Sequence, residues 1–301
     1  MKNISGMKLR CTIILVAFAF FLSACQGKRE NTQKAHPESF TFVFMTDLHL
    51  NFADNGSFDG FRQAIQKAKE LGADFIITGG DNVDADVVGD DEDTARALFT
   101  EFKNIIDQSG IDFKVTIGNH DRFWHQPEST ESHGAALFTE FFPETWYHWD
   151  YKGVKFIHLN TSEVCDGDYC VSPKQRVWLQ NTLAETSQNT PIILVVHVPL
   201  LSFYYPALYG YYTHTDVFQG FKEIWDMFKD HNLQLVLQGH MHLYEELNVL
   251  NTQFITGGAL SGSWWSGPYH GTKEGFVLVH WDGEELTWSY QDFGWQALVT
   301  D

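Results

Sequence analysis

The sequence TFVFMTDLH spans residues 41–49 and joins a run of apolar and β-branched residues directly to an aspartate and a histidine. The run predicts a buried strand at 41–46 that ends in a polar turn. A helix is expected at 57–71, because Phe58, Phe61 and Ile65 recur every three or four residues. A second apolar run at 74–78 then completes a β-α-β unit.

The rest of the chain continues this alternation of apolar runs and helical periodicity. A helix is expected at 217–228, where Phe221, Ile224 and Phe228 share one face. Further strands are expected at 114–117, 155–160, 192–196, 234–237, 244–250, 253–256, 275–280 and 285–290. The pattern predicts an α/β fold with mixed sheets and outer helices in one domain at 39–301.

Four more motifs place polar side chains directly after apolar runs. They are Gly80-Asp81-Asn82, Gly118-Asn119-His120-Asp121, Val196-His197-Val198-Pro199 and Gly239-His240-Met241-His242. Strand ends are where open α/β sheets bind ligands. On extended backbone, residues two apart such as Asp47 and His49 face the same side. Each motif alone is a weak signal that also occurs in an ordinary turn or at a buried histidine, so the prediction depends on their combination. Together they offer oxygen and nitrogen donors for two metal ions, without thiolates.

In this order the five motifs resemble those of the calcineurin-like metallophosphoesterase superfamily, over about residues 39–294. The resemblance implies a metallophosphoesterase-type α/β sandwich with two central mixed sheets and outer helices. It also implies two divalent or trivalent transition metal ions, of Mn, Fe, Zn, Co or Ni. The implied ligands are Asp47, His49 and His242 for one ion, Asn119, His197 and His240 for the other, and Asp81 as the bridge.

The resemblance further implies hydrolysis of phosphoester bonds by a hydroxide that bridges the two metals. His120 corresponds to the histidine that assists the leaving group, and Asp121, next in sequence, is expected to orient it. Arg122 is expected either to contact the phosphate or to lie in solvent.

Two positions depart from the patterns of particular branches. Purple acid phosphatases carry a tyrosine iron ligand three residues after the bridging aspartate, where this chain has Asp84. The chain is more similar to the bacterial branch that includes class III cyclic nucleotide phosphodiesterases, although Asn160 stands where such relatives often have aspartate. The substrate therefore stays open between a phosphodiester and a phosphomonoester, on a small molecule that includes nucleotide-like compounds.

Aromatic residues crowd the loops beside the motifs. We expect them to form a rim that stacks on a flat part of the substrate, with packing inside the loops as the alternative. The residues assigned to this rim are Trp124, Tyr204, Tyr205, Trp264 and Trp265. Such a rim would equally serve a degenerate lipoprotein binding module that recognises a glycan or a partner, but the intact ligand set favours an enzyme.

The charge restricts the partners. The 301 residues include 20 basic and 39 acidic side chains, which gives a net charge of −19. Such a surface repels a phosphate backbone, so a long nucleic acid is not expected as a partner. No protein partner is evident from the sequence.

The N-terminal residues carry a targeting pattern. A basic segment precedes an apolar run at 11–22 that is too short to span a bilayer. The sequence LSAC at 22–25 resembles a bacterial lipoprotein box, which predicts a signal peptide at 1–24, a lipid on Cys25 and a flexible tether at 25–38. The protein is then exported and membrane-anchored, with the outer membrane or cell surface favoured over the inner membrane. An ordinary cleaved signal is the alternative.

Two cysteines remain in the expected domain. Cys165 and Cys170 lie five residues apart. In an oxidising compartment this pair predicts a small loop disulfide, and the alternatives are two free thiols or a metal clip without further partners.

Overall fold

The computed structural model describes residues 38–125, 134–213 and 216–298. The predicted signal peptide, Cys25 and nearly all of the tether therefore lie outside the described residues. Five strands form the first sheet: β1 (Phe40–Met45), β2 (Phe75–Thr78), β3 (Asp112–Val115), β12 (Gly275–Trp281) and β13 (Leu286–Asp292). Their order is β13-β12-β1-β2-β3, with β1, β2 and β3 parallel and the other two antiparallel to their neighbours.

The second sheet is also mixed. Its strands are β4 (Tyr147–Tyr151), β5 (Val154–His158), β8 (Pro191–Val195), β9 (Asn232–Gln238), β10 (Glu245–Val249) and β11 (Thr252–Thr256). The order is β10-β11-β9-β8-β5-β4, with four parallel strands in the middle and an antiparallel strand at each edge. A separate hairpin pairs β6 (Glu163–Cys165) with β7 (Asp168–Cys170).

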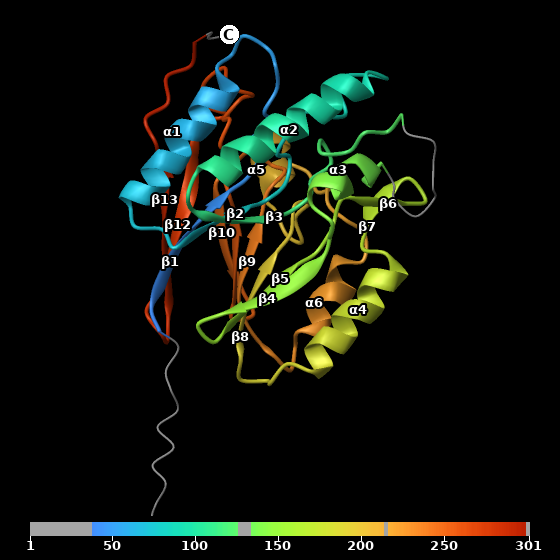
Figure 1. Ribbon diagram of the computed structural model, residues 1–301. Helices are drawn as coiled ribbons and strands as arrows, with labels where there is room; N and C mark the ends of the chain where they lie inside the picture. Colours follow the sequence, from blue (N-terminus) through green and yellow to red (C-terminus); the bar gives the residue numbers. More distant parts are fainter. Residues whose placement is uncertain (1–37, 126–133, 214–215, 299–301) are drawn as a thin grey trace, which may run out of the picture. The chain divides into compact units, whose positions relative to one another are not determined.

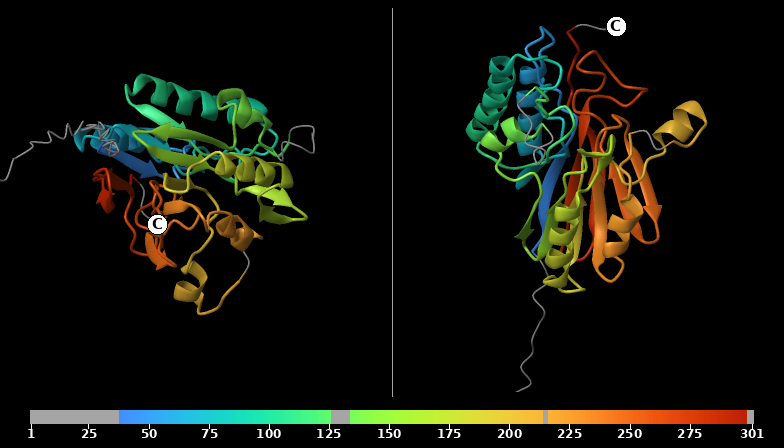
Figure 2. Two further views of the ribbon diagram at one scale, coloured as in Figure 1. Left: turned by 90° about the horizontal axis from the view of Figure 1, so that it is seen from below. Right: turned by 90° about the vertical axis from the view of Figure 1, so that its right-hand side faces the viewer.

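Helices cover the outer face of each sheet (Figure 1, Figure 2). On the first sheet lie α1 (Ser57–Glu70), α2 (Glu92–Gln108) and α3 (Ala136–Phe141), which share one apolar cluster with β1 and β2. On the second lie α4 (Pro173–Ala184) and α6 (Phe221–Met227), which share another with β8 and β9. The short helix α5 (Tyr204–Tyr209) buries no residue. No helix in the described part of the chain is long and apolar enough to cross a membrane.

The inner faces of the two sheets make a third apolar layer, and β1 contributes to two layers. Phe42 and Phe44 pack with Phe156 and Leu237 of the other sheet, whereas Val43 faces the helices. Because successive side chains of a strand point to opposite faces, a strand buried on both sides reads as one continuous apolar run. The predicted α/β sandwich with two mixed sheets and outer helices is confirmed.

The structure differs from the predicted elements in two ways. The helix expected at 217–228 begins only at Phe221, because Gly220 before it has a left-handed φ of 81°. Strands β4, β6 and β7 were not predicted, since β4 alternates exposed and half-buried residues and the hairpin strands are only three residues long.

Candidate metal centre

The five polar motifs meet at one edge of the sandwich. Each follows the carboxyl end of a parallel strand: Asp47 follows β1, Asp81 follows β2, Asn119 follows β3, His197 follows β8 and His240 follows β9. Backbone hydrogen bonds continue beyond the strands, from Asp47 N to Gly80 O at 3.0 Å and from Gly239 N to His197 O at 3.0 Å. The parallel strands of both sheets therefore bring the motifs together.

The backbone at these ligands is left-handed rather than extended. The φ angles are 54° at Asp47, 48° at His49, 51° at Asp81, 72° at His240 and 57° at His242. The expectation that extended backbone aligns the paired ligands is therefore wrong, although the pairs do converge. Left-handed residues other than glycine cost of order 1–3 kcal/mol each and gather at functional sites, where the surrounding structure imposes them.

Glycine permits the close approach of two of these motifs. A Cβ atom on Gly118 would collide with the carboxylate and backbone nitrogen of Asp81. One on Gly239 would collide with the side chains of Thr46 and Asp47. These positions have no room for a larger residue unless the ligands move.

The first donor cluster consists of Asp47, His49 and His242, whose ligand atoms lie within 4.8 Å of one another. His242 Nδ1 donates to Gly262 O at 3.0 Å, and His49 Nδ1 lies 2.7 Å from Asp84 Oδ1. These contacts occupy both Nδ1 atoms, and the two Nε2 atoms face each other at 3.0 Å. Asp84 thus orients a predicted ligand, a role that the sequence did not reveal.

The second donor cluster consists of Asp81, His197 and His240, also within 4.8 Å. His197 Nδ1 donates to Gly79 O at 2.8 Å, while its Nε2 lies 3.0 Å from Asn119 Oδ1 and 3.1 Å from Asp81 Oδ2. The same Asp81 oxygen lies 3.9 Å from His49 Nε2 in the first cluster. Asp81 therefore lies between the clusters, where a bridging ligand belongs.

The electrostatics of the site favour cations. Burial alone would raise the pKa of Asp81, but His197 and His120 hold it well below its usual range. Burial lowers the pKa of His197, yet the Asp81 carboxylate overrides this and raises it to about 9. Buried carboxylates surrounded by imidazole nitrogens require positive charge nearby. The oxygen and nitrogen donors, free of sulfur, fit two transition metal ions.

His120 lies beside the donor clusters without joining either of the two assigned sets. Its ring centre is 4.8 Å from that of His49, and its Nδ1 lies 2.8 Å from Asp86 Oδ1. Burial lowers the pKa of His120, but the carboxylates of Asp81 and Asp86 raise it to about 10.

The expectation that Asp121 orients His120 is corrected by these contacts. Asp121 is buried and accepts hydrogen bonds from the backbone nitrogens of Asn82, Val83 and Gly118, at 2.8 to 3.0 Å, and from the Asn82 amide. It joins the loops after β2 and β3, whereas Asp86 contacts the imidazole of His120.

A cleft of about 190 Å³ opens onto the site, and aromatic side chains form much of its wall. Trp264 lies against the ligands, with its ring centre 4.4 Å from that of His242 and 5.3 Å from that of His49. Tyr204 Oη and Tyr269 Oη are 2.6 Å apart, which joins α5 to the loop of Trp264. The lining residues are Asp81, His120, Tyr204, Tyr205, Asp216, His240, Met241, His242, Trp264 and Tyr269.

Three residues assigned to substrate contacts lie elsewhere. Trp265 is only 1% exposed and donates from Nε1 to Leu48 O at 2.9 Å, so it is a core residue. Trp124 is exposed but does not line the cleft. Arg122 is neither solvated nor part of the cleft lining, because it is fully buried and donates to Asn160 Oδ1 at 3.0 Å. Burial lowers the pKa of Arg122 to about 10.

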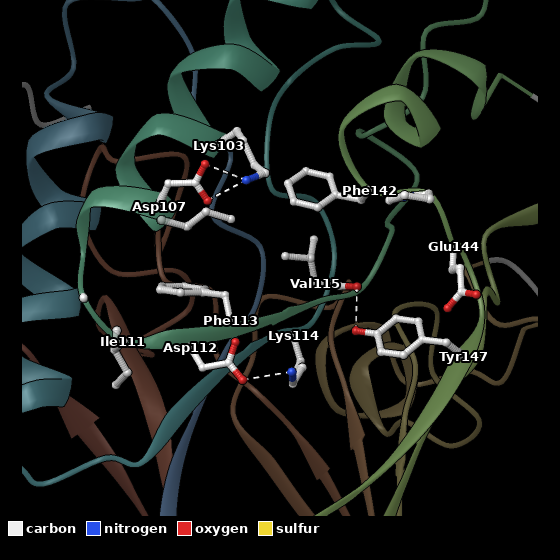
Figure 3. A pocket seen from close by; sticks show the side chains of 13 residues that line it. Lys103, Asp107, Ile111, Asp112, Phe113, Lys114, Val115, Phe142, Glu144 and Tyr147 are labelled. Atoms are coloured by element: carbon white, nitrogen blue, oxygen red, sulfur yellow. Dashed lines mark hydrogen bonds and ion pairs between the residues drawn. The ribbon is translucent and has the colours of Figure 1, made fainter.

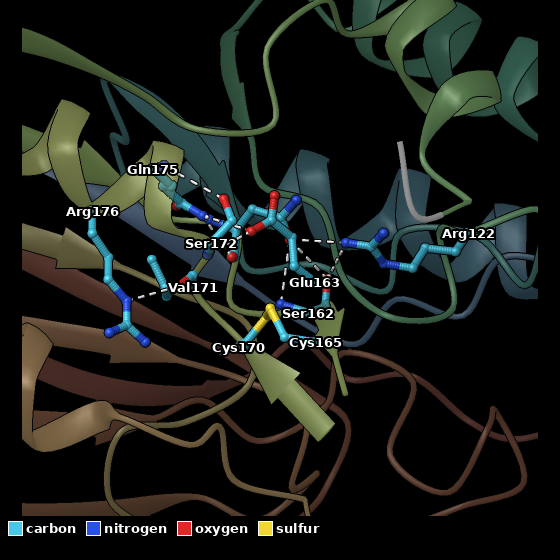
Figure 4. The surroundings of a disulfide bond; sticks show 10 residues. Arg122, Ser162, Glu163, Cys165, Cys170, Val171, Ser172, Gln175 and Arg176 are labelled. Atoms are coloured by element: carbon cyan, nitrogen blue, oxygen red, sulfur yellow. Dashed lines mark hydrogen bonds between the residues drawn. A yellow bond between two sulfur atoms is a disulfide. The ribbon is translucent and has the colours of Figure 1, made fainter. Parts of the chain in front are cut away.

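A disulfide joins Cys165 to Cys170 and closes the β6–β7 hairpin (Figure 4). Glu163 at the base of the hairpin accepts from Ser172 N at 2.8 Å. The hairpin also carries Tyr169, whose ring meets that of His240 edge-on with 5.7 Å between their centres. Tyr169 was not predicted as a site residue, and nothing in its sequence context marks it.

A larger cavity of about 670 Å³ lies away from the site, between α2, β3 and the start of β4 (Figure 3). Its wall includes the ion pairs of Lys103 with Asp107 and of Lys114 with Asp112. Tyr147 Oη donates to Val115 O at 3.0 Å across it. No histidine is among the described residues that line this cavity, and these residues therefore lack the donor set of the metal centre.

Comparisons with solved structures agree with the fold. A dimetal phosphatase from Danio rerio (LOC 393393) is 13% identical with a TM-score of 0.62, over 87% of this chain and 99% of that one. Purple acid phosphatase PPD1 from yellow lupin is 17% identical with a TM-score of 0.59, over 85% of this chain and 52% of that one. GAP50, the anchor in the inner membrane complex of Plasmodium, is 17% identical with a TM-score of 0.56, over 85% of each chain.

At these identities the similarity is one of fold, and no curated protein matches the sequence. The model of the calcineurin-like phosphoesterase family matches residues 40–244, which is more than half of the chain and includes all seven predicted ligands. The chain therefore belongs to the calcineurin-like phosphoesterase family.

Proposed function

We propose that this protein hydrolyses a phosphoester bond of a small substrate with the help of two transition metal ions. The observation that carries the proposal is the position of Asp81 between the two donor clusters. Its Oδ2 atom lies 3.1 Å from His197 Nε2 in one cluster and 3.9 Å from His49 Nε2 in the other. One cluster would hold its ion through Asp47, His49 and His242, and the other through Asn119, His197 and His240. Two such ions, when bound, supply an activated water and neutralise charge on the phosphoryl oxygens.

The side chains of the site have complementary roles in this reaction. His120 has its Nδ1 engaged by Asp86, which leaves Nε2 to deliver a proton to the leaving oxygen. Asp84 contacts Nδ1 of His49 and leaves its Nε2 free to hold the first ion, and the Gly262 carbonyl does the same for His242. Trp264 and the tyrosines at the cleft form an aromatic wall on one side of the site.

We infer that the substrate is small and carries a flat group. The cleft of about 190 Å³ has room for one small moiety, and Trp264, which is 43% exposed, offers an aromatic face beside the first cluster. The net charge of −19 disfavours a long nucleic acid. A nucleotide-like phosphodiester or phosphomonoester fits both observations.

The second candidate function is a binding module that retains the fold without catalysis. GAP50 is an anchor in the inner membrane complex of Plasmodium, so the fold also occurs in a protein named for anchoring. A module of this kind would bind a glycan or a partner through the aromatic cleft. The presence of Asp81 together with the six other predicted ligands favours hydrolysis, because a binding module has no need of them.

The test combines metal analysis with a substrate screen. We expect about two Mn, Fe, Zn, Co or Ni ions per chain and Mn²⁺-stimulated hydrolysis of phosphomonoesters, phosphodiesters or cyclic nucleotides. Asp81→Asn should lower both the metal content and the rate, whereas Asp59→Asn, at a side chain that is 84% exposed on α1, should change neither. A protein that binds no metal and hydrolyses none of these esters would contradict the proposal.

We also propose that the protein is exported and anchored by a lipid on Cys25. The support is the LSAC sequence at 22–25 after an apolar run. Cys25→Ala should abolish incorporation of a labelled fatty acid in a bacterial host, and Cys165→Ala provides a matched cysteine control. Equal labelling of the Cys25→Ala protein and the natural protein would contradict the proposal.

A further inference from the structure

Tyr169 lies beside the second donor cluster of the metal centre. It lies on β7, pairs with Val164 of β6, and is neighbour to Cys170 of the disulfide. Its ring packs edge-on against His240, a predicted ligand, with an interplanar angle of 84°. Burial, together with the carboxylates of Asp81 and Asp216, raises the pKa of the Tyr169 phenol to about 12, against the opposing effect of the Arg122 guanidinium. The phenol therefore keeps its proton and can donate a hydrogen bond at neutral pH.

The hydroxyl of Tyr169 has no hydrogen-bond partner among the described residues, although the side chain is half-buried. Tyr169 adjoins His240 without lining the cleft, and the tyrosines that do line the cleft differ from it in this respect. The Tyr205 hydroxyl donates a hydrogen bond to the Asp216 carboxylate, and the Tyr204 and Tyr269 hydroxyls are hydrogen-bonded to each other. A half-buried donor without a protein partner is available to a ligand, and a phosphoryl oxygen is a strong acceptor.

The hairpin holds Tyr169 firmly in this place. The disulfide closes the turn that precedes the residue, and Gln219 N donates to Tyr169 O at 2.9 Å. Gln219 Nε2 donates to Asp168 Oδ2 at 2.8 Å, which fixes the adjacent residue as well. At the base of the hairpin, the Arg176 side chain donates to Val171 O at 2.9 Å (Figure 4). A donor that is already immobilised loses little further conformational entropy on binding.

We propose that Tyr169 is a substrate-binding residue whose hydroxyl donates a hydrogen bond to a nonbridging oxygen of the phosphoryl group, and that the Cys165–Cys170 disulfide holds this donor in place. This proposal rests on the proposed phosphoester hydrolysis, because that reaction supplies the phosphoryl group that Tyr169 would bind. The alternative is that the Tyr169 ring only packs against His240 and holds that ligand in position. The two roles separate in Tyr169→Phe, which keeps the ring and removes the hydroxyl.

The experiment measures binding of inorganic phosphate to Mn²⁺-treated protein by calorimetry, together with metal content, thermal midpoint and kinetics on an active ester. We expect Tyr169→Phe to weaken phosphate binding roughly 10-fold and to raise KM, since a hydrogen bond to a charged group is lost. Metal content and the thermal midpoint should not change. Tyr151→Phe, which removes a hydroxyl at the tip of the β4–β5 hairpin, is the matched control and should bind phosphate as the natural protein does.

The outcomes separate the two proposals. Unchanged phosphate affinity in Tyr169→Phe, or a loss of metal in that variant, would overturn the role of the hydroxyl. A natural protein that binds phosphate with this dependence on Tyr169 but hydrolyses no ester would overturn the proposed function and leave the binding role intact.

The disulfide is tested in the same assay. The double variant Cys165→Ser and Cys170→Ser should weaken phosphate binding, and the effect should disappear in a Tyr169→Phe background because both changes act on one contact. Independent, multiplicative effects would overturn the link between the disulfide and the hydroxyl, as would full affinity in the double cysteine variant.

Discussion

His49 Nδ1 and Asp84 Oδ1 lie 2.7 Å apart, and this contact decides which imidazole nitrogen faces the first donor cluster. Asp84 is itself held by Asn51, whose amide donates to the other carboxylate oxygen at 2.8 Å. Purple acid phosphatases have a tyrosine ligand at this position in the motif, whereas here a carboxylate stands behind a histidine. The sequence position is shared, but its role differs.

Removing this carboxylate should weaken metal binding at the first cluster. We expect Asp84→Ala to lower metal affinity about 10- to 100-fold, because His49 would lose the partner that fixes its tautomer and ring orientation. Asp84→Asn should have a smaller effect, since the amide oxygen can still accept from Nδ1. Metal titration followed by elemental analysis measures both. Equal affinities for the natural protein and Asp84→Ala would show that His49 is oriented by its packing alone.

The contact between His120 and Asp86 yields a prediction on the leaving group. His120→Ala should retain its metals and lose about 10² to 10⁴ in rate on esters with poor leaving groups, because proton delivery is lost. The loss should be much smaller on p-nitrophenyl esters, whose leaving group needs little protonation. Asp86→Asn should show the same dependence on the leaving group with a smaller loss. An equal loss on both kinds of ester would contradict the role of His120.

Asp121→Asn provides the contrast, because its carboxylate holds the loops rather than His120. Its oxygens accept from the backbones of Asn82, Val83 and Gly118. We expect the free energy of unfolding to fall by roughly 1–3 kcal/mol, because the amide of asparagine cannot accept all the buried hydrogen bonds that the carboxylate accepts. The rate should fall by the same factor on good and poor leaving groups. A loss confined to poor leaving groups would restore Asp121 as the residue that orients His120.

The convergence of the candidate ligands could be predicted from the sequence because its signals are tied to topology. Parallel strands in one sheet end at the same edge, so polar motifs that follow β1, β2 and β3 must converge. The conformation at these ends could not be predicted in the same way. Asp47 and His240 adopt left-handed φ angles that are uncommon for residues other than glycine, and only the packed loops impose them.

The partners of the ligands were harder to predict, because similar residues lie close together in the sequence. Asp84 and Asp86 follow Asp81 in one acidic loop, and only tertiary contacts assign one to His49 and the other to His120. Neighbouring aromatic residues present the same difficulty. Trp264 and Trp265 are both left-handed, yet one faces the ligands and the other enters the core.

Because these two tryptophans have different surroundings, we expect the replacement of Trp264 to weaken substrate binding and the replacement of Trp265 to lower stability. Trp264→Ala should cost ~1 to 3 kcal/mol of binding to a nucleotide-like substrate if the indole stacks on it, and almost nothing for a small aliphatic phosphate. Trp265→Ala should instead lower the free energy of unfolding by about 3–5 kcal/mol, because it leaves a cavity beside Gly60. Kinetics and denaturant unfolding on both variants test the distinction. Unchanged kinetics in Trp264→Ala on both substrates would mean that this indole does not select the leaving group.

A buried histidine outside the predicted ligand set should make stability depend on pH. His158 on β5 is fully buried, with Nδ1 2.9 Å from Thr116 Oγ1, and its Nε2 accepts from Trp149 Nε1 at 3.1 Å. Because indole can only donate, Nε2 must carry the lone pair and Nδ1 the proton. Burial, with a contribution from Lys114, lowers the pKa of His158 from 6.5 to about 3. The folded protein therefore keeps this ring neutral at pH values where the unfolded chain protonates it.

The sign of the effect follows from proton binding. Between pH 6.5 and about 3 the unfolded state binds one more proton at His158 than the folded state, so acidification favours unfolding. The stability is fully present above pH 6.5 and falls toward pH 3 by up to about 1.4 kcal/mol per pH unit.

His158→Asn should lower stability at pH 7 but reduce the slope of the free energy of unfolding against pH between 6 and 4 by nearly that amount. Trp149→Phe should reduce the slope less, by removing the donor that opposes protonation. Denaturant unfolding at several pH values gives this slope for each variant and for the natural protein. Contributions from other titrating groups are shared by all of them and cancel in the difference between two slopes. A slope unchanged by His158→Asn would mean that the ring takes up its proton inside the fold, at the expense of the Trp149 contact.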